Sequence, residues 1–96
     1  MKLEYISTFC TDISNVASYL EDYPQKAKRI FEEIDNKLNK LIDNPEMYPI
    51  YQDFPMFRRI VIEDYLLFYL VNKRTDIIEV HRIIYGRMDV LKQLSI

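Results

Sequence analysis

The segment FRRIVIEDYLLFYLV, residues 57–71, decides how this chain folds. It contains two runs of β-branched and aromatic residues, 57–62 and 65–71, separated only by Glu63 and Asp64. Two strands joined by two residues form a tight antiparallel hairpin. The second run carries no charged side chain, which is typical of a strand covered on both faces of its sheet. The segment therefore predicts a hairpin at the centre of the core.

Two further runs complete the expected sheet. The run IIEVHRIIY (77–85) follows the polar stretch NKRTD, and such short connections favour a three-stranded antiparallel meander. Near the start of the chain, KLEYISTF (2–9) alternates apolar and polar residues as a short strand does. Four strands are thus expected, the first of them far from the others in the sequence.

Two helices are expected between the first strand and the hairpin. Thr11 is a candidate N-cap, and apolar side chains recur from Ile13 at helical spacing, at positions i, i+3, i+4 and i+7. Pro24 ends that helix and can open the next one. The second helix should end near Asp43, since the residue before Pro45 is pushed out of the helical region. Its apolar stripe consists of Ala27, Ile30, Phe31, Ile34, Leu38, Leu41 and Ile42.

The order β-α-α-β-β-β predicts an α+β fold, in which a helical hairpin packs on one face of a small, mostly antiparallel sheet. The last residues, RMDVLKQLSI (87–96), have apolar side chains at helical spacing and predict a short C-terminal helix. A chain of 96 residues suits one compact domain, so we expect a single domain over residues 1–96.

The composition excludes several functional classes. One cysteine and one histidine allow neither a disulfide framework nor a protein-only transition-metal site, so Cys10 is expected to be a buried structural thiol. With one glycine the chain has no P-loop and no dinucleotide-binding motif, and no cofactor is expected. The net charge of −2 argues against a dedicated nucleic-acid binder, which usually has a strong basic excess.

The N-terminal sequence MKLEYISTF does not resemble a signal peptide, because polar residues interrupt its few apolar ones. No apolar run approaches the ~20 residues that a membrane span needs. We therefore expect a cytoplasmic protein with no membrane contact.

The candidate functional residues lie on the outer strands of the predicted meander. Strict alternation groups either Arg59 with His81 and Tyr85, or Arg58 with Arg82, on the sheet surface that the two helices leave open. Such arginines can hold phosphate through paired hydrogen bonds, or they can simply solvate an open face. His81 is a candidate general acid or base in RNA cleavage, or a hydrogen-bonded polar strand residue. Tyr85 can stack on a base or lie at the rim of the core.

The segment after the last strand supplies three more candidates. Gly86 most simply permits the turn out of the strand. Asp89 can pair with Arg87 and cap the final helix.

Two motifs resemble the RelE/ParE superfamily of toxins from type II toxin–antitoxin (plasmid stabilisation) systems. The first is the spacing of Arg58, Arg59, Tyr65 and Tyr69 along the hairpin, and the second is the strand-end sequence RIIYGRMD (82–89). The resemblance covers essentially the whole chain. It implies the fold predicted above and a growth-inhibiting bacterial toxin that forms a hetero-oligomer with a cognate antitoxin.

The superfamily has two branches, and this chain looks more like the ParE branch. RelE toxins are basic and cleave mRNA in the ribosome with strand lysines and arginines and, often, a C-terminal tyrosine. Here Val61 and Leu66 occupy two of the basic positions, and no tyrosine follows Tyr85. ParE toxins inhibit DNA gyrase and are not nucleases. The resemblance therefore implies gyrase binding, with Arg58, Arg59, Arg82, Arg87, Asp89 and the C-terminal segment as candidate target contacts.

Two alternatives stay open. One is a RelE-like, ribosome-dependent mRNA endonuclease that binds ribosome and mRNA, in which Arg59, His81, Arg82 and Tyr85 are the catalytic candidates. The other is an inactive homologue that only binds its antitoxin. Whether the chain is an enzyme depends on this choice, and in every case the arginines can instead support the fold or contact the antitoxin.

Overall fold

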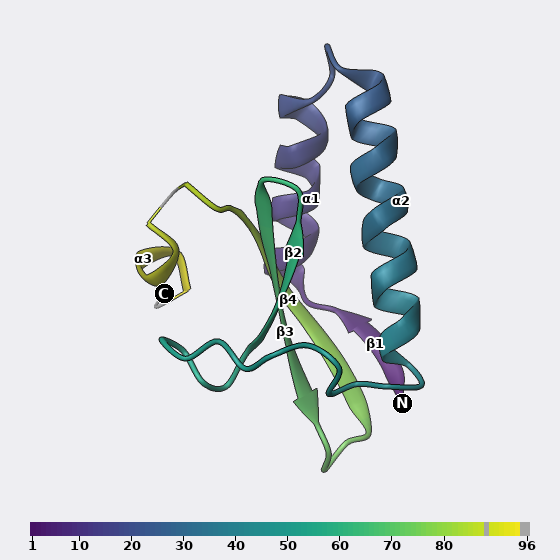
Figure 1. Ribbon diagram of the computed structural model, residues 1–96, viewed down its shortest axis with the longest axis vertical. Coiled ribbons are helices and arrows are strands. Elements are labelled where there is room, and N and C mark those ends of the chain that lie inside the picture. The colour runs from purple at the N-terminus through teal and green to yellow at the C-terminus, as the bar shows by residue number, and fades with distance from the viewer. Residues whose placement is uncertain (88, 95–96) are drawn as a thin grey trace.

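The computed structural model describes residues 1–87 and 89–94 (Figure 1). In these residues the order of elements is the predicted one, which confirms the α+β class and the short C-terminal helix, although residues 88, 95 and 96 of the predicted helical segment lie outside the description. The elements are β1 (Lys2–Tyr5), α1 (Ser7–Tyr19), α2 (Pro24–Leu41), β2 (Arg58–Ile62), β3 (Tyr65–Asn72), β4 (Ile77–Tyr85) and α3 (Val90–Leu94).

The predicted hairpin lies in a four-stranded sheet of order β1-β4-β3-β2. The strands β2, β3 and β4 are antiparallel neighbours, and β1 pairs with β4 in parallel. Ile62 pairs with Tyr65, so Glu63 and Asp64 form a two-residue turn, and Glu63 has a left-handed backbone with φ of 51°. Arg29 of α2 donates two hydrogen bonds, of 2.8 and 3.0 Å, to the Glu63 carboxylate and lowers its pKa. The ion pair ties the turn to α2.

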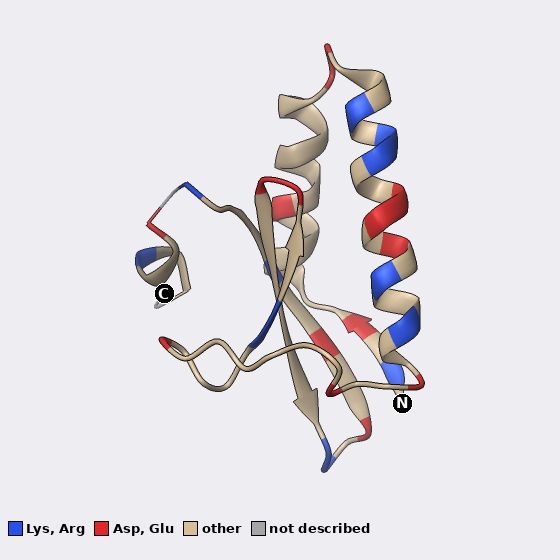
Figure 2. Cartoon of the chain, viewed as in Figure 1, with Lys and Arg blue, Asp and Glu red and all other residues tan. Residues whose placement is uncertain are grey.

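The main core lies between the helical hairpin and one face of the sheet (Figure 1). Pro24 opens α2 as predicted, because the N–H that proline lacks has no partner in a first helical turn. The helix ends at Leu41, slightly before Asp43, and its charged side chains lie off the apolar stripe (Figure 2). No helix among the described residues is long and apolar enough to cross a membrane. The stripe is confirmed, since Ile30, Ile34, Leu38 and Leu41 are buried, Ala27 and Phe31 are partly buried, and only Ile42 is exposed.

A second, smaller core covers much of the opposite face of the sheet. Phe68 is fully buried at its centre, with ring centroids 5.1 Å from Tyr51 and 6.2 Å from Phe57 in edge-on contacts. Tyr51 and Phe57 belong to the segment between α2 and β2, and Leu94 of α3 completes the cluster with Ile84. The sheet surface that the two long helices leave open is therefore occupied by this segment and α3.

α1 begins four residues before Thr11, so the predicted start was wrong. The cause is a contact that is distant in sequence: the Ile6 N–H donates to the Val80 carbonyl at 3.0 Å, and the first strand ends there. Phe9 consequently lies in the first turns of the helix, where it is buried. Cys10 is exposed on that helix, so the prediction of a buried thiol was also wrong.

β4 contains a β-bulge that strict alternation did not predict. Arg82 is the partner of Phe68, whereas Val80 is the partner of the next residue, Tyr69. His81 is therefore an extra residue without its own partner on β3, which is the arrangement of a bulge.

The bulge exchanges the faces of the residues that follow it. Ile83 belongs to the main core together with Ile78 and Val80, and Tyr85 packs against that core. Ile84 belongs to the smaller core on the other face. Alternation had placed Tyr85 on the face of His81, and this prediction was wrong.

The hydroxyl of Tyr69 should make the stability of the protein depend on pH. Its hydroxyl donates to the Pro45 carbonyl at 2.8 Å, and burial raises its pKa to about 12. Because the unfolded chain releases this proton near pH ~10, the contribution of Tyr69 to stability is complete below that pH and is lost between about 10 and 12. We expect the urea midpoint of the Tyr69→Phe variant to fall less steeply over this range than that of the wild type. Tyr23→Phe, at an exposed position, is the control, and equal slopes for wild type and Tyr69→Phe would contradict the account.

Candidate functional site

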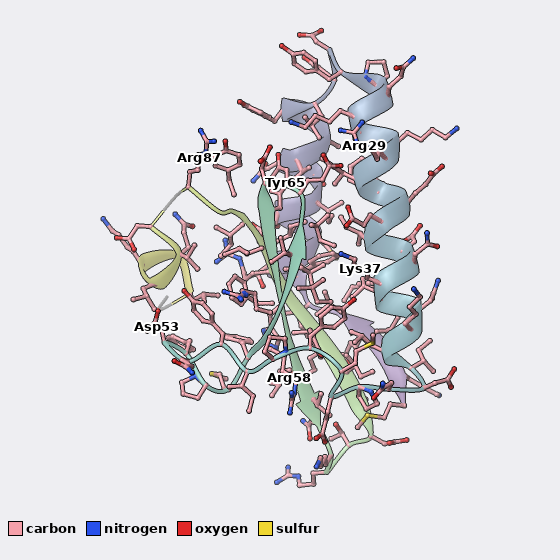
Figure 3. The ribbon with its side chains drawn as sticks, in the orientation of Figure 1. Arg29, Lys37, Asp53, Arg58, Tyr65 and Arg87 are labelled. Carbon is pink, nitrogen blue, oxygen red and sulfur yellow. The ribbon has the colours of Figure 1, made fainter. Side chains whose placement is uncertain are left out.

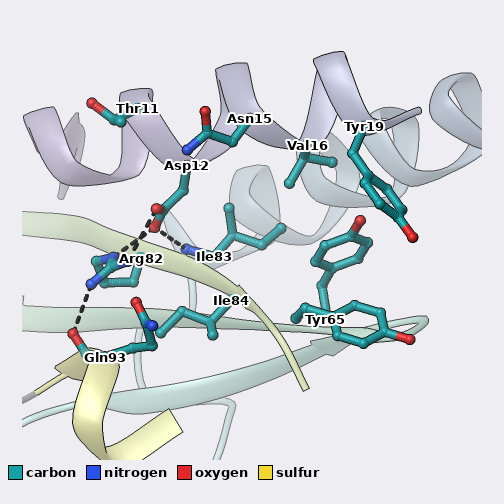
Figure 4. A pocket seen from close by; sticks show the side chains of 11 residues that line it. Thr11, Asp12, Asn15, Val16, Tyr19, Tyr65, Arg82, Ile83, Ile84 and Gln93 are labelled. Carbon is teal, nitrogen blue, oxygen red and sulfur yellow. Dashed lines mark hydrogen bonds and ion pairs between the residues drawn. The ribbon is translucent and has the colours of Figure 1, made fainter. Parts of the chain in front are cut away.

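Two adjoining cavities lie along α1, where it faces β4 and α3, and we call them together the α1 cleft. The larger has a volume of about 680 Å³ and the smaller about 480 Å³. Both have Thr11, Asp12, Arg82 and Gln93 in their lining, so these residues stand between the two halves. The larger half is lined in addition by Asn15, Val16, Tyr19, Tyr65, Ile83, Ile84 and Tyr85 (Figure 4).

Arg82 forms a clamp at the centre of the cleft. Its Nε and Nη2 donate to the two carboxylate oxygens of Asp12 at 2.6 and 3.1 Å, and Nη1 donates to the Gln93 carbonyl of α3 at 2.8 Å (Figure 4). Asp12 also accepts the Ile83 N–H at 3.1 Å. The side chains of Arg82 and Asp12 are only 19% and 13% exposed. One guanidinium thus ties β4 to both α1 and α3.

Asp12 is the only charged residue of α1 (Figure 2). Its position in the second turn follows from the early start of the helix, and it faces β4 there. A lone carboxylate on a helix that packs on a sheet needs a paired cation and further donors. Arg82 and the Ile83 N–H supply them, so this pair joins α1 to β4.

His81 lies in the smaller half of the cleft and belongs to a polar chain. Its Nε2 is 3.0 Å from one carboxylate oxygen of Glu79, and Asn72 donates to the other oxygen at 3.0 Å. These two hydrogen bonds lower the pKa of Glu79. The imidazole also packs edge-on against Phe57, with centroids 5.1 Å apart, and Thr8 donates to the His81 carbonyl at 2.8 Å. This environment matches the hydrogen-bonded strand residue that was the alternative to a catalytic base.

Arg58 and Arg59 point to opposite faces of β2. Arg58 donates to the carbonyls of Tyr48 and Glu46 at 2.7 and 3.3 Å and lies 3.6 Å from the Glu46 carboxylate. It therefore fastens the segment before β2 (Figure 3). Arg59 lies with its guanidinium 6.0 Å from the ring centroid of Tyr51 and has no ion pair among the described residues.

The last residue of β4 and the two residues after it have different roles. Tyr85 stacks edge-on against Tyr65, with centroids 5.7 Å apart. Gly86 donates its N–H to the Asp64 carbonyl at 2.8 Å, and a Cβ here would lie 3.1 Å from that oxygen, so the close approach of two backbones explains the glycine. Arg87 is exposed and points outward (Figure 3), and in the described part of the chain it has no ion pair.

Asp89 caps α3 as predicted. Its carboxylate accepts the Lys92 N–H at 3.2 Å, and its carbonyl accepts the Gln93 N–H at 3.1 Å. The predicted ion pair with Arg87 does not form within the described residues.

Neither predicted grouping of strand residues occurs. Arg59 and Arg82 are both partners of Phe68 in the sheet, and Tyr85 lies against the main core instead. Of the nuclease candidates, Tyr85 therefore lies on the opposite face of the sheet from Arg59 and Arg82, because of the bulge. The Arg82 guanidinium is engaged by Asp12 and Gln93. Among the described residues, no group of three or more histidines, cysteines and carboxylates could hold a metal ion.

Among the cleft residues that sequence reasoning did not select are Asp12, Asn15, Tyr19 and Gln93. One signal was available, since Thr11, Asn15 and Tyr19 recur at i, i+4 and i+8, which places them in one row on a helix. The partner of that row is fixed only by the long-range packing of α1 on β4.

Comparison with known proteins agrees with this geometry. The family described as "ParE toxin of type II toxin-antitoxin system, parDE" matches residues 3–90. The chain belongs to the ParE toxin family. This confirms the resemblance to the RelE/ParE superfamily and its assignment to the ParE branch, and it implies an antitoxin partner.

Solved structures show the same fold for this ParE family member. One is the chromosomal ParDE toxin–antitoxin system of P. aeruginosa, with a TM-score of 0.72 and 17% identity, covering 88% of this chain and 95% of the other. Another is the isolated E. coli RelE toxin, with a TM-score of 0.66 and 15% identity, covering 98% and 94%. No curated protein matches the sequence significantly.

Proposed function

We propose that the protein is a toxin that inhibits DNA gyrase and is neutralised by a cognate antitoxin. The match of the ParE family over residues 3–90 carries this proposal. Two observations support it as well: Tyr85 lies on the other face of the sheet from Arg59 and Arg82, and Arg82 is held by Asp12. General acid–base cleavage of RNA needs groups that reach one phosphodiester together.

The target contacts of the toxin are, in this proposal, Arg59 and Arg87. Both guanidinium groups lack an ion pair within residues 1–87 and 89–94, so they can bind another molecule without first breaking an ion pair. Arg58, Arg82 and Asp89 contribute indirectly. They hold the segment before β2, the cleft and α3 in the shape that presents the two free arginines.

The first test is the supercoiling of relaxed plasmid by purified gyrase. We expect the wild-type protein to inhibit at micromolar concentration, and the Arg59→Ala/Arg87→Ala double variant to need about tenfold more protein or higher. Arg74→Ala is the matched control, since Arg74 is exposed in the turn between β3 and β4 and should be dispensable.

Folded protein that leaves gyrase unaffected would overturn the proposal. Cleavage of mRNA on translating ribosomes that His81→Ala abolishes would instead identify the protein as a RelE-like endonuclease. Inactivity in both assays, with binding to an antitoxin, would identify a homologue that has kept only the binding function.

A further inference from the structure

A row of apolar side chains reaches the surface near the turn of the β2–β3 hairpin. Val61 pairs with Leu66 across β2 and β3, and Leu66 pairs with Ile84 across β3 and β4. Paired residues point to the same face of a sheet, and Leu66 and Ile84 belong to the smaller core. Ile84 is buried, Leu66 is partly exposed, and Val61 is 51% exposed at the end of the row. We call the two exposed members, Val61 and Leu66, the hairpin strip.

Two arginines border the hairpin strip. Arg59 lies two residues before Val61 on β2, so it is on the same face of the sheet. A Cβ on Gly86 would lie 3.8 Å from the Leu66 Cγ, and the exposed Arg87 follows Gly86 directly (Figure 3). Neither guanidinium has an ion pair within the described parts of the chain. An apolar surface thus lies between two cations that have no ion pair.

The carboxylates of the hairpin turn do not compensate these cations, because α2 engages both of them. Glu63 accepts two hydrogen bonds from Arg29, and the Asp64 carboxylate lies 3.5 Å from the Lys26 Nζ. The surface around the hairpin strip is therefore locally positive, although the chain has a net charge of −2. Complementary potentials favour a partner that is acidic at this place.

The edge of β2 beside the hairpin strip is already hydrogen-bonded. The Arg59 N–H donates to the Pro49 carbonyl at 3.1 Å, and the Lys37 Nζ donates to the Val61 carbonyl at 3.0 Å. A partner that binds by adding a strand needs such backbone groups free. A partner therefore contacts this region through side chains laid on the face of the sheet.

The mixture of apolar and cationic side chains favours a protein over a nucleic acid. Binding to DNA draws its affinity from several cations that neutralise phosphates, whereas protein interfaces combine apolar contacts with arginine. We propose that a protein surface of gyrase, rather than its DNA, docks on the hairpin strip, with an apolar side chain against Val61 and Leu66 and carboxylates on Arg59 and Arg87. This inference rests on the proposed function and specifies the chemistry of its contact.

The test measures binding of the full chain to purified gyrase without DNA, by biolayer interferometry, and to a DNA duplex alone. We expect gyrase to bind without DNA, and Val61→Ser to weaken this binding and the inhibition of supercoiling about tenfold. Val61→Glu should weaken both at least as much, since it also repels an acidic partner. Ile50→Ser and Ile50→Glu are the matched controls and should behave as the wild type does. Ile50 is 50% exposed and pairs with Arg58 at the same edge, which places it on the opposite face.

Several results would overturn the inference alone: inhibition by Val61→Ser and Val61→Glu equal to that of the wild type, or gyrase binding that requires DNA. Binding of the duplex that the Arg59→Ala/Arg87→Ala variant loses would overturn it as well, because the arginines would then contact DNA. So would self-association of the wild type that Val61→Ser abolishes, since a second copy would then cover the strip. A folded wild type that neither binds nor inhibits gyrase would overturn the proposed function and this inference together.

Discussion

Replacement of Arg82 by alanine should lower the free energy of unfolding by about 2–4 kcal/mol, because it removes three hydrogen bonds and leaves Asp12 as an unpaired carboxylate. The loss also releases Gln93, so the amides of α3 should exchange faster with solvent. Urea unfolding gives the free energy, and hydrogen exchange gives the local effect.

Two variants make the Arg82 prediction specific. Arg74→Ala removes an exposed arginine and should change stability by less than about 0.5 kcal/mol. Asp12→Asn keeps the size of the side chain but lacks the charge. Its free energy of unfolding should therefore lie between those of Arg82→Ala and Arg74→Ala. If Arg82→Ala were as stable as Arg74→Ala, the hydrogen bonds of Arg82 would have no structural role. Arg82 would then again be a candidate for direct contact with the target.

Phe68→Ala should destabilise the protein by about 3–5 kcal/mol, the range for removal of a fully buried aromatic ring. The ring holds together Tyr51 and Phe57 on one side of the sheet, in the cluster that also contains Leu94. Its loss should therefore loosen both α3 and the segment before β2. Thermal unfolding and hydrogen exchange measure the two effects.

Phe54→Ala is the matched control for Phe68. Phe54 stacks on Phe57 at 5.6 Å but is partly exposed, so its removal leaves a smaller cavity and should have a clearly smaller effect. Equal destabilisation by the two variants would mean that the second core does not depend on its buried centre.

Most of the fold was predictable because its signals are local. The charge-free run of β3, the apolar stripe of α2 and the proline at its start each depend on residues close in sequence. The start of α1 was not predictable, because the Val80 carbonyl that ends β1 lies more than seventy residues away. No capping side chain marks that start, and Thr11 offered a stronger local signal.

The arrangement of the site was less predictable than the fold. One extra residue, His81, reverses the face of everything after it, and a bulge leaves no clear mark in a run as regular as IIEVHRIIY. The partners of the candidate residues depend on packing between distant elements. Arg82 is an example: its motif suggested a contact with the target, whereas in the fold its guanidinium donates to Asp12.

We propose that the chain inhibits gyrase through Arg59 and Arg87 rather than cutting RNA. The most direct measurement is to express it in a bacterial host and isolate DNA with covalently attached gyrase, while following mRNA integrity in the same cells. The account predicts trapped gyrase–DNA complexes and intact mRNA for the wild type, and few complexes for the Arg59→Ala/Arg87→Ala variant. Growth arrest with cleaved mRNA and no trapped gyrase would contradict it.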